Sequence, residues 1–152
     1  WSDESSEILM ACDAELQFMC RRIKGLDLTG VRSLREHYES DTSAAMTRKI
    51  KSIQAFKGIN APMVENPEGF IPDFQSRYFT EDFPYGLCII KGIADILRME
   101  TPRIDEVLQW YETVTGVTYY ENGYFNGPDL EGLPIPRNFG IDSMEELVRY
   151  YS

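Results

Sequence analysis

Apolar residues recur every three or four positions along most of the chain, which is the spacing of helices that turn one side toward a core. The run Leu87–Leu97 is apolar on nearly every side, so we expect it to be the central, most buried helix. The pattern predicts about six helices in all: residues 5–24, a short one around Val31 to Tyr38, one from Met46 that ends near Gly58, Leu87–Leu97, residues 101–116, and a last one that begins at Asp142.

Polar residues mark where these helices should begin, because a side-chain oxygen can accept a hydrogen bond from the first free backbone amides. Glycines mark where helices stop, as Gly25 and Gly116 do here. The expected N-caps are Ser5 or Ser6, Asp41, Thr101 before Pro102, Asp142 with Glu145 three residues later, and, before the central helix, Asp82 with its oxygen on the amide of Tyr85.

Two segments rich in proline and glycine interrupt the helical pattern. Residues 60–74 are expected to form an ordered loop, given the apolar Met63, Val64, Phe70 and Ile71. Residues 117–141 are also expected to be loop, with a short hairpin at Tyr119–Phe125 around Asn122-Gly123 as an option. With no repeat or interdomain linker visible, the sequence predicts a single all-α domain over residues 1–152.

Composition and net charge limit the classes of partner that the chain is expected to bind. With 152 residues, 43% of them hydrophobic, the chain has enough apolar material for one core. A net charge of −10 disfavours nucleic acid and anionic membrane surfaces, so small molecules or proteins are the expected partners. Three irregularly spaced cysteines and the lack of a long apolar segment or a signal pattern predict a reduced, cytoplasmic protein, with Cys88 as a small core residue.

Most familiar chemical motifs are missing from this sequence. His37 is the single histidine and lies among charged residues, where we expect a solvated surface position. No Cys-x-x-Cys pair, glycine-rich nucleotide fingerprint or Gly-x-Ser-x-Gly elbow occurs. The chain alone therefore lacks the parts of a complete enzyme.

The segment Arg77–Asp82 carries the remaining candidate chemistry, because a cation and a carboxylate five residues apart stand in front of the central helix. An arginine suits bidentate binding of a keto acid or amino acid carboxylate, and an aspartate can orient a histidine or bind an amino group. Two structural alternatives stay open at this point. Asp82 could be the N-cap described above, and Arg77 an ordinary ion-pair partner of Glu81 or Asp82.

The block from Gly69 to Lys91 reads Gly-Phe-Ile-Pro-Asp-Phe-Gln-Ser-Arg-Tyr-Phe-Thr-Glu-Asp-Phe-Pro-Tyr-Gly-Leu-Cys-Ile-Ile-Lys. It resembles the signature of the octopine/nopaline (opine) dehydrogenase family, in which Arg-Tyr-x-Thr-Glu-Asp precedes a hydrophobic helix. Weaker similarity covers nearly the whole chain. The resemblance implies a helical substrate domain of the 6-phosphogluconate dehydrogenase-like kind, with an NAD- or NADP-binding Rossmann domain upstream.

The resemblance also implies a reaction and residue roles. Such enzymes reductively join an amino acid amine to an α-keto acid such as pyruvate. Arg77 would bind a substrate carboxylate, and Asp82 would pair with a catalytic histidine that lies upstream of Trp1, a place that His37 does not occupy. We therefore expect the chain to be a piece of a longer protein, inactive alone.

The alternative is a stand-alone helical binding or dimerisation module without catalysis. An upstream Rossmann fingerprint in the same reading frame would favour the enzyme, whereas an initiator codon just before Trp1 would favour the module. A homodimer is a further candidate assembly for either. The choice of amino acid, keto acid and nucleotide depends on the shape of a pocket that both domains would form.

Overall fold

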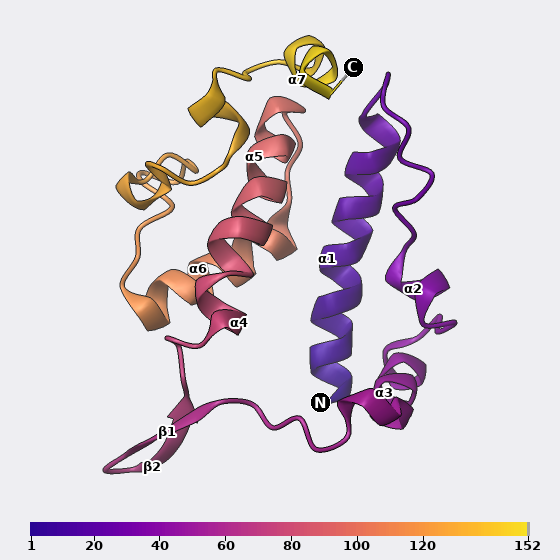
Figure 1. The fold of residues 1–152 in the computed structure, drawn as a ribbon, viewed down its shortest axis with the longest axis vertical. Coiled ribbons are helices and arrows are strands. Elements are labelled where there is room, and N and C mark those ends of the chain that lie inside the picture. The colour runs from indigo at the N-terminus through magenta and orange to yellow at the C-terminus, as the bar shows by residue number, and fades with distance from the viewer. Residues whose placement is uncertain (152) are drawn as a thin grey trace.

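The computed structural model describes residues 1–151, and it is mostly α-helical as the apolar periodicity predicts (Figure 1). The six expected helices are present, and a short additional helix, α4, precedes the central one. The elements are α1 (Asp3–Arg22), α2 (Leu34–His37), α3 (Ser43–Ser52), β1 (Met63–Asn66), β2 (Gly69–Pro72), α4 (Arg77–Thr80), a π turn (Phe83–Leu87), α5 (Cys88–Ile96), α6 (Pro102–Thr115) and α7 (Met144–Tyr151), with 3-10 turns at 54–56, 128–130 and 136–139.

Helix α1 runs along the middle of the molecule, with α2 and α3 on one side and α5 and α6 on the other (Figure 1). A buried hydroxyl pair joins α1 to α3, because the Oγ of Ser6 lies 2.8 Å from the Oγ1 of Thr47. On the other side, the Glu15 carboxylate accepts hydrogen bonds from the backbone amides of Arg103 and Ile104 at 2.8 and 3.0 Å. Polar contacts thus fix both neighbours of α1.

Two apolar clusters form the core. The larger one joins α5 and α6 to the segment 119–135, and its fully buried members include Cys88, Leu108 and Ile135. The smaller one packs Met19 of α1 against Ala94 and Leu97 at the end of α5. Helix α5 contributes to both clusters, which confirms that it is central, and Cys88, at 0% exposure, is the small core residue that the sequence predicts.

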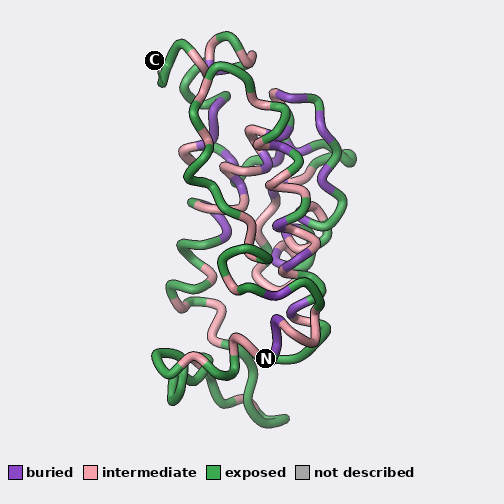
Figure 2. The backbone as a smooth tube through the Cα atoms, turned by 90° about the vertical axis from the view of Figure 1, so that its right-hand side faces the viewer, coloured by how far each residue is buried: buried purple, intermediate pink, exposed green. Residues whose placement is uncertain are grey.

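Residues 63–72 form an antiparallel hairpin, so the expectation of a loop over residues 60–74 was wrong. The prolines exclude a helix, but they are tolerated in an isolated two-stranded ribbon, where few backbone amides must donate. The turn is closed locally, because the Glu68 amide donates to the Asn66 Oδ1 at 3.1 Å and Gly69 adopts a φ of 132°. The hairpin extends away from the helices, and most of its residues are exposed (Figures 1 and 2). The residue Phe70, for example, is 70% exposed.

The second expected hairpin exists in minimal form. Asn122 and Gly123 both have positive φ angles, 53° and 81°, as the tightest two-residue turn requires. Only Glu121 and Tyr124 pair across it. The rest of the segment 117–141 is loop with short 3-10 turns, as predicted.

Several helices are capped by a different residue from the one that the sequence predicts. The hydroxyls of Ser2, Thr42 and Ser143 accept the first amide hydrogen bonds of α1, α3 and α7, in place of the expected Ser5 or Ser6, Asp41 and Asp142. Thr101 does stand at the N-cap position of α6, but its hydroxyl donates to Asp105 and caps no amide. The Glu15 carboxylate satisfies those amides instead, a long-range contact that local sequence patterns do not report.

Candidate functional site

Residues 77–87 form one continuous path from α4 through the π turn into α5. Pro84 has no backbone N–H, so the normal helical ladder is interrupted at this point. The Leu87 amide instead donates five residues back to the Asp82 carbonyl at 3.0 Å. Widened turns of this type occur frequently at functional sites within helices.

Aromatic side chains hold the inner side of this path against α6. The Phe83 ring stacks on Tyr111 with centroids 4.1 Å apart, and Phe79 lies 6.0 Å from Phe83. Phe79 also lies edge-on to Phe74, with ring centroids 5.0 Å apart, and tilted to Trp110 at 6.2 Å. Because the apolar side is packed in this way, the polar side chains of the same turns, Arg77, Glu81 and Asp82, are exposed.

The structure places Arg77 on α4 with its side chain 76% exposed. Its Nη2 donates to the Glu81 Oε2 at 3.1 Å, one helical turn along. The ion pair with Glu81 that the sequence left open is therefore present in this chain. An exposed pair of this type contributes only about 0.3–0.5 kcal/mol, so a ligand carboxylate could displace Glu81 at small cost.

The N-cap interpretation of Asp82 was wrong. Its backbone is right-handed helical, at φ −69° and ψ −32°, and its side chain makes no capping bond. The Tyr85 amide, the expected partner, donates instead to the Glu81 carbonyl at 2.9 Å. Asp82 is exposed, and no hydrogen bond or ion pair to its carboxylate occurs within residues 1–151. Its carboxylate is available to a group outside this chain.

His37 is exposed on α2 and contacts the Tyr38 ring at 4.7 Å, which confirms the predicted surface position. Helix α2, which ends at His37, and helix α4 lie on opposite sides of α1 (Figure 1). Arg77 and Asp82 themselves face outward from neighbouring turns, but no ion pair joins them, and a shared pocket would need a second surface.

The sequence did not predict the cluster of charged residues that surrounds the buried Lys91 of α5. Only 9% of the Lys91 side chain is exposed, and its Nζ lies 3.0 Å from the Asp105 Oδ1, 3.4 Å from the Asp95 Oδ1 and 3.2 Å from the Thr101 Oγ1. The Tyr120 hydroxyl donates to Asp105 at 2.7 Å. The available signal was a lone lysine within the apolar run Leu87–Leu97.

Burial governs the proton affinities of this cluster. Desolvation raises the pKa of the Asp95 carboxyl, and the nearby Lys91 ammonium partly opposes that shift. Desolvation and the hydrogen bond to Asp105 both raise the pKa of Tyr120, so its hydroxyl remains a donor at any working pH. The cluster is thus a set of charges that satisfy one another and join α5 to α6.

The structure also bears on metal binding and on membrane insertion. Within residues 1–151, no three His, Cys, Asp or Glu side chains come together in a group that could hold a metal ion. None of the helices in that range is both long and apolar enough to cross a bilayer.

The fold defines a class of protein. A solved structure of octopine dehydrogenase, described as its complex with NADH and pyruvate, superposes with a TM-score of 0.84 at 26% sequence identity. The match covers 97% of this chain and 37% of that one. Residues 1–115 match the family model described as "NAD/NADP octopine/nopaline dehydrogenase, alpha-helical domain". The chain therefore belongs to the octopine/nopaline dehydrogenase family and carries its helical domain.

Curated relatives agree with this assignment. The opine dehydrogenase of Haliotis discus hannai is 37% identical over 131 residues, which are 81% of this chain and 32% of the relative. The tauropine dehydrogenase of Arabella iricolor is 33% identical over 133 residues, 82% of this chain and 33% of the relative. The octopine dehydrogenase of Pecten maximus is 26% identical over 95% of this chain. The chain thus spans about a third of the length of the curated relatives that it matches.

Proposed function

We propose that this chain is the substrate-binding domain of an NAD(P)-dependent dehydrogenase that reductively condenses the amine of an amino acid with an α-keto acid such as pyruvate. Family membership supports the reaction class, and pyruvate is the keto acid in the solved complex of octopine dehydrogenase that this chain resembles. The nucleotide would be bound mainly by a Rossmann domain of the same protein, in the cytoplasm. The chain itself would supply substrate contacts.

The observation that carries the proposal is the exposed polar side of residues 77–82, which aromatic contacts join to α6 on the other side. Charged groups on a fixed backbone cost little to organise when a ligand arrives. The Arg77 guanidinium would bind a substrate carboxylate through two parallel hydrogen bonds, in place of its single bond to Glu81. A second domain closing over it would exclude water and strengthen that contact.

Asp82 would act on a histidine of the upstream part of the protein. A carboxylate beside an imidazole stabilises the imidazolium, so the pKa of that histidine rises toward working pH. The histidine could then deliver a proton while hydride from the nucleotide reduces the imine carbon. The exposure of Asp82 and its lack of a partner within residues 1–151 support this role.

The test is steady-state kinetics of the full-length protein with Arg77→Ala. Removing one partner of a desolvated charge pair costs about 2 to 5 kcal/mol, so we expect KM for the keto acid to rise roughly thirtyfold or more. Glu81→Ala is the matched control, because it breaks the same surface ion pair while keeping the guanidinium, and it should change KM less than about threefold. An unchanged KM in Arg77→Ala, or equal effects of the two variants, would remove Arg77 from the substrate site.

A further inference from the structure

The hairpin formed by β1 and β2 carries apolar side chains on both of its faces. Its register pairs Val64 with Ile71 on one face and places Met63 and Phe70 on the other. All four residues are at least 40% exposed. An antiparallel sheet commonly turns one apolar face to a core and a polar face to water, and an isolated two-stranded ribbon is at best marginally stable in water. Apolar residues on both faces of a projecting ribbon therefore indicate a surface that covers it.

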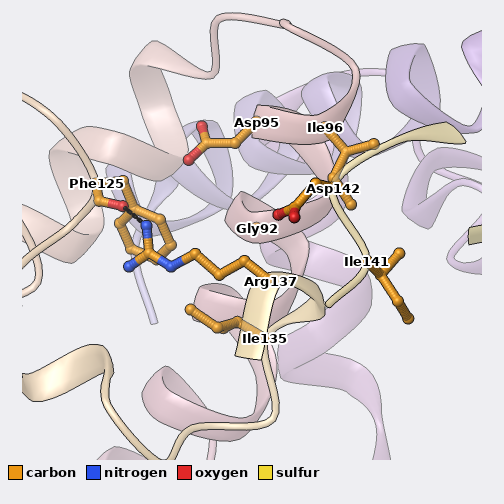
Figure 3. A pocket seen from close by; sticks show the side chains of 8 residues that line it. All are labelled: Gly92, Asp95, Ile96, Phe125, Ile135, Arg137, Ile141 and Asp142. Atoms are coloured by element: carbon orange, nitrogen blue, oxygen red, sulfur yellow. Dashed lines mark hydrogen bonds between the residues drawn. The ribbon is translucent and has the colours of Figure 1, made fainter. Parts of the chain in front are cut away.

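The other long non-helical segment shows the contrast, because this chain covers its apolar residues. In the hollow beside α5 (Figure 3), Ile135 and Ile141 are only 0% and 7% exposed. Their segment packs closely on α5 at Gly92, where a Cβ would lie 2.9 Å from the Pro136 Cδ. The hairpin instead projects from the helices (Figures 1 and 2), so a surface that covers it must come from outside residues 1–151.

The base of the hairpin is joined to the aromatic residues beneath α4. The Asp73 amide donates to the Pro62 carbonyl at 2.9 Å, one position beyond the last pair of the ladder. The next residue, Phe74, lies edge-on to Phe79 of α4, with ring centroids 5.0 Å apart. The hairpin thus stands directly before α4, the helix that begins at Arg77, and a surface that packs on the hairpin would lie next to that helix.

Length and charge favour one occupant for this surface. This chain spans only 32% and 33% of two curated relatives and 37% of the solved octopine dehydrogenase chain, so those proteins contain a large part beyond the matching domain. A second copy of this chain is disfavoured, because each copy has a net charge of −10 and each hairpin presents the exposed Glu65 and Glu68. Pro72 at the end of β2 also lacks the amide that a further strand would need.

We propose that the hairpin of residues 63–72 is a docking arm that packs on the nucleotide-binding domain of the same polypeptide. The surface that receives it would be apolar at its centre and would carry lysine or arginine side chains at its rim, opposite Glu65 and Glu68. This inference rests on the part of the proposed function that places a second domain in the same protein. It does not use the roles of Arg77 and Asp82.

Hydroxyl-radical footprinting of the unmodified full-length protein measures whether the hairpin is covered. The rate at which Phe70 is oxidised is compared with its rate in the same protein unfolded in urea. Because a packed interface excludes water, we expect oxidation at least about tenfold slower in the folded protein, and equally slow at high and low protein concentration. Without a covering surface, a residue that is 70% exposed should react within about twofold of the unfolded rate, and that result would overturn the proposal. Protection that disappears on dilution would assign the surface to a second copy and would overturn it equally.

Photo-cross-linking identifies the occupant. With p-benzoylphenylalanine in place of Phe70, we expect cross-links within one polypeptide to the nucleotide-binding domain. The matched control places the same residue at Tyr150, which is 62% exposed on α7 at the opposite end of the molecule (Figure 1), and should give none. Cross-links between two copies, or equal cross-linking from both positions, would overturn the proposal. An uncovered hairpin in a protein whose KM still rises in Arg77→Ala would remove this inference and leave the proposed substrate contact standing.

Discussion

Replacing Lys91 with methionine tests whether the buried charged cluster holds α5 against α6. Methionine keeps most of the length of the side chain but removes the ammonium, so the contacts to Asp105, Asp95 and Thr101 at 3.0, 3.4 and 3.2 Å are lost. Removing one partner of a fully buried pair costs about 3–5 kcal/mol, chiefly because the remaining charge stays desolvated.

The cost here should be smaller, because the carboxylates keep some water and some partners. The Asp105 side chain is 26% exposed and still accepts from Tyr120, while Asp95 is 44% exposed. We therefore expect Lys91→Met to lower the free energy of unfolding by about 2–3 kcal/mol, which for a domain of this size is a fall in Tm of roughly 4–12 °C.

Urea denaturation and thermal melts measure this, with Lys49→Met as the matched control. Lys49 makes an ion pair of similar length with Glu39, 2.9 Å, but its side chain is 40% exposed and that of Glu39 79%, so the control should lose at most about 0.5 kcal/mol. Adding Asp105→Asn to Lys91→Met should restore part of the loss, because the uncompensated carboxylate is gone. Equal losses at Lys91 and Lys49, or a double variant that is less stable than the sum predicts, would refute the reasoning.

Two further predictions concern stability and thiol reactivity. Glu15→Ala leaves two backbone amides of α6 without acceptors, so it should lower the free energy of unfolding, measured by urea denaturation, by about 1–2 kcal/mol. Glu7→Ala, on the exposed side of α1, should lower it by less than about 0.5 kcal/mol. Equal losses in the two variants would contradict the capping role of Glu15. Burial raises the pKa of Cys88 to about 12 and that of Cys12 to about 11, so both thiols should stay protonated and resist a disulfide reagent at pH 8, while the less buried Cys20 reacts first. Mass spectrometry of partly modified protein checks the order, and early modification of Cys88 would contradict it.

The helices were predictable because their stripes of apolar residues are long and one-sided. The N-cap residues were harder to predict, because two neighbouring residues can both be good N-caps, as Asp41 and Thr42 are before α3. The hairpin at residues 63–72 was missed because its prolines obscure the alternation of a strand and its apolar side chains are 40% or more exposed, so no one-sided burial pattern marks it. Local patterns thus gave the elements more reliably than their ends.

In the candidate site, too, the sequence predicted the local residue pattern but not the contacts between distant segments. The sequence shows Arg77 and Asp82 in front of an apolar helix, and it also allowed the ion pair of Arg77 with Glu81 as an alternative. Asp82 does not cap the next helix because its backbone is itself helical and leads directly into the π turn, where the Phe83 ring stacks on Tyr111. The Lys91 cluster joins residues from α5, α6 and the loop at Tyr120, and no local pattern links them.

The most direct test of the central proposal is the pH dependence of kcat/KM for the keto acid, measured in the reductive condensation with the amino acid, for the full-length protein and its Asp82→Asn variant. An ionised Asp82 would raise the pKa of the catalytic histidine, so the wild-type activity should fall only as pH rises through that raised value. In Asp82→Asn the imidazolium loses its partner, and the fall should move about one pH unit or more to lower pH, with the melting temperature nearly unchanged. A profile that does not move in a folded variant would contradict the pairing of Asp82 with the catalytic acid.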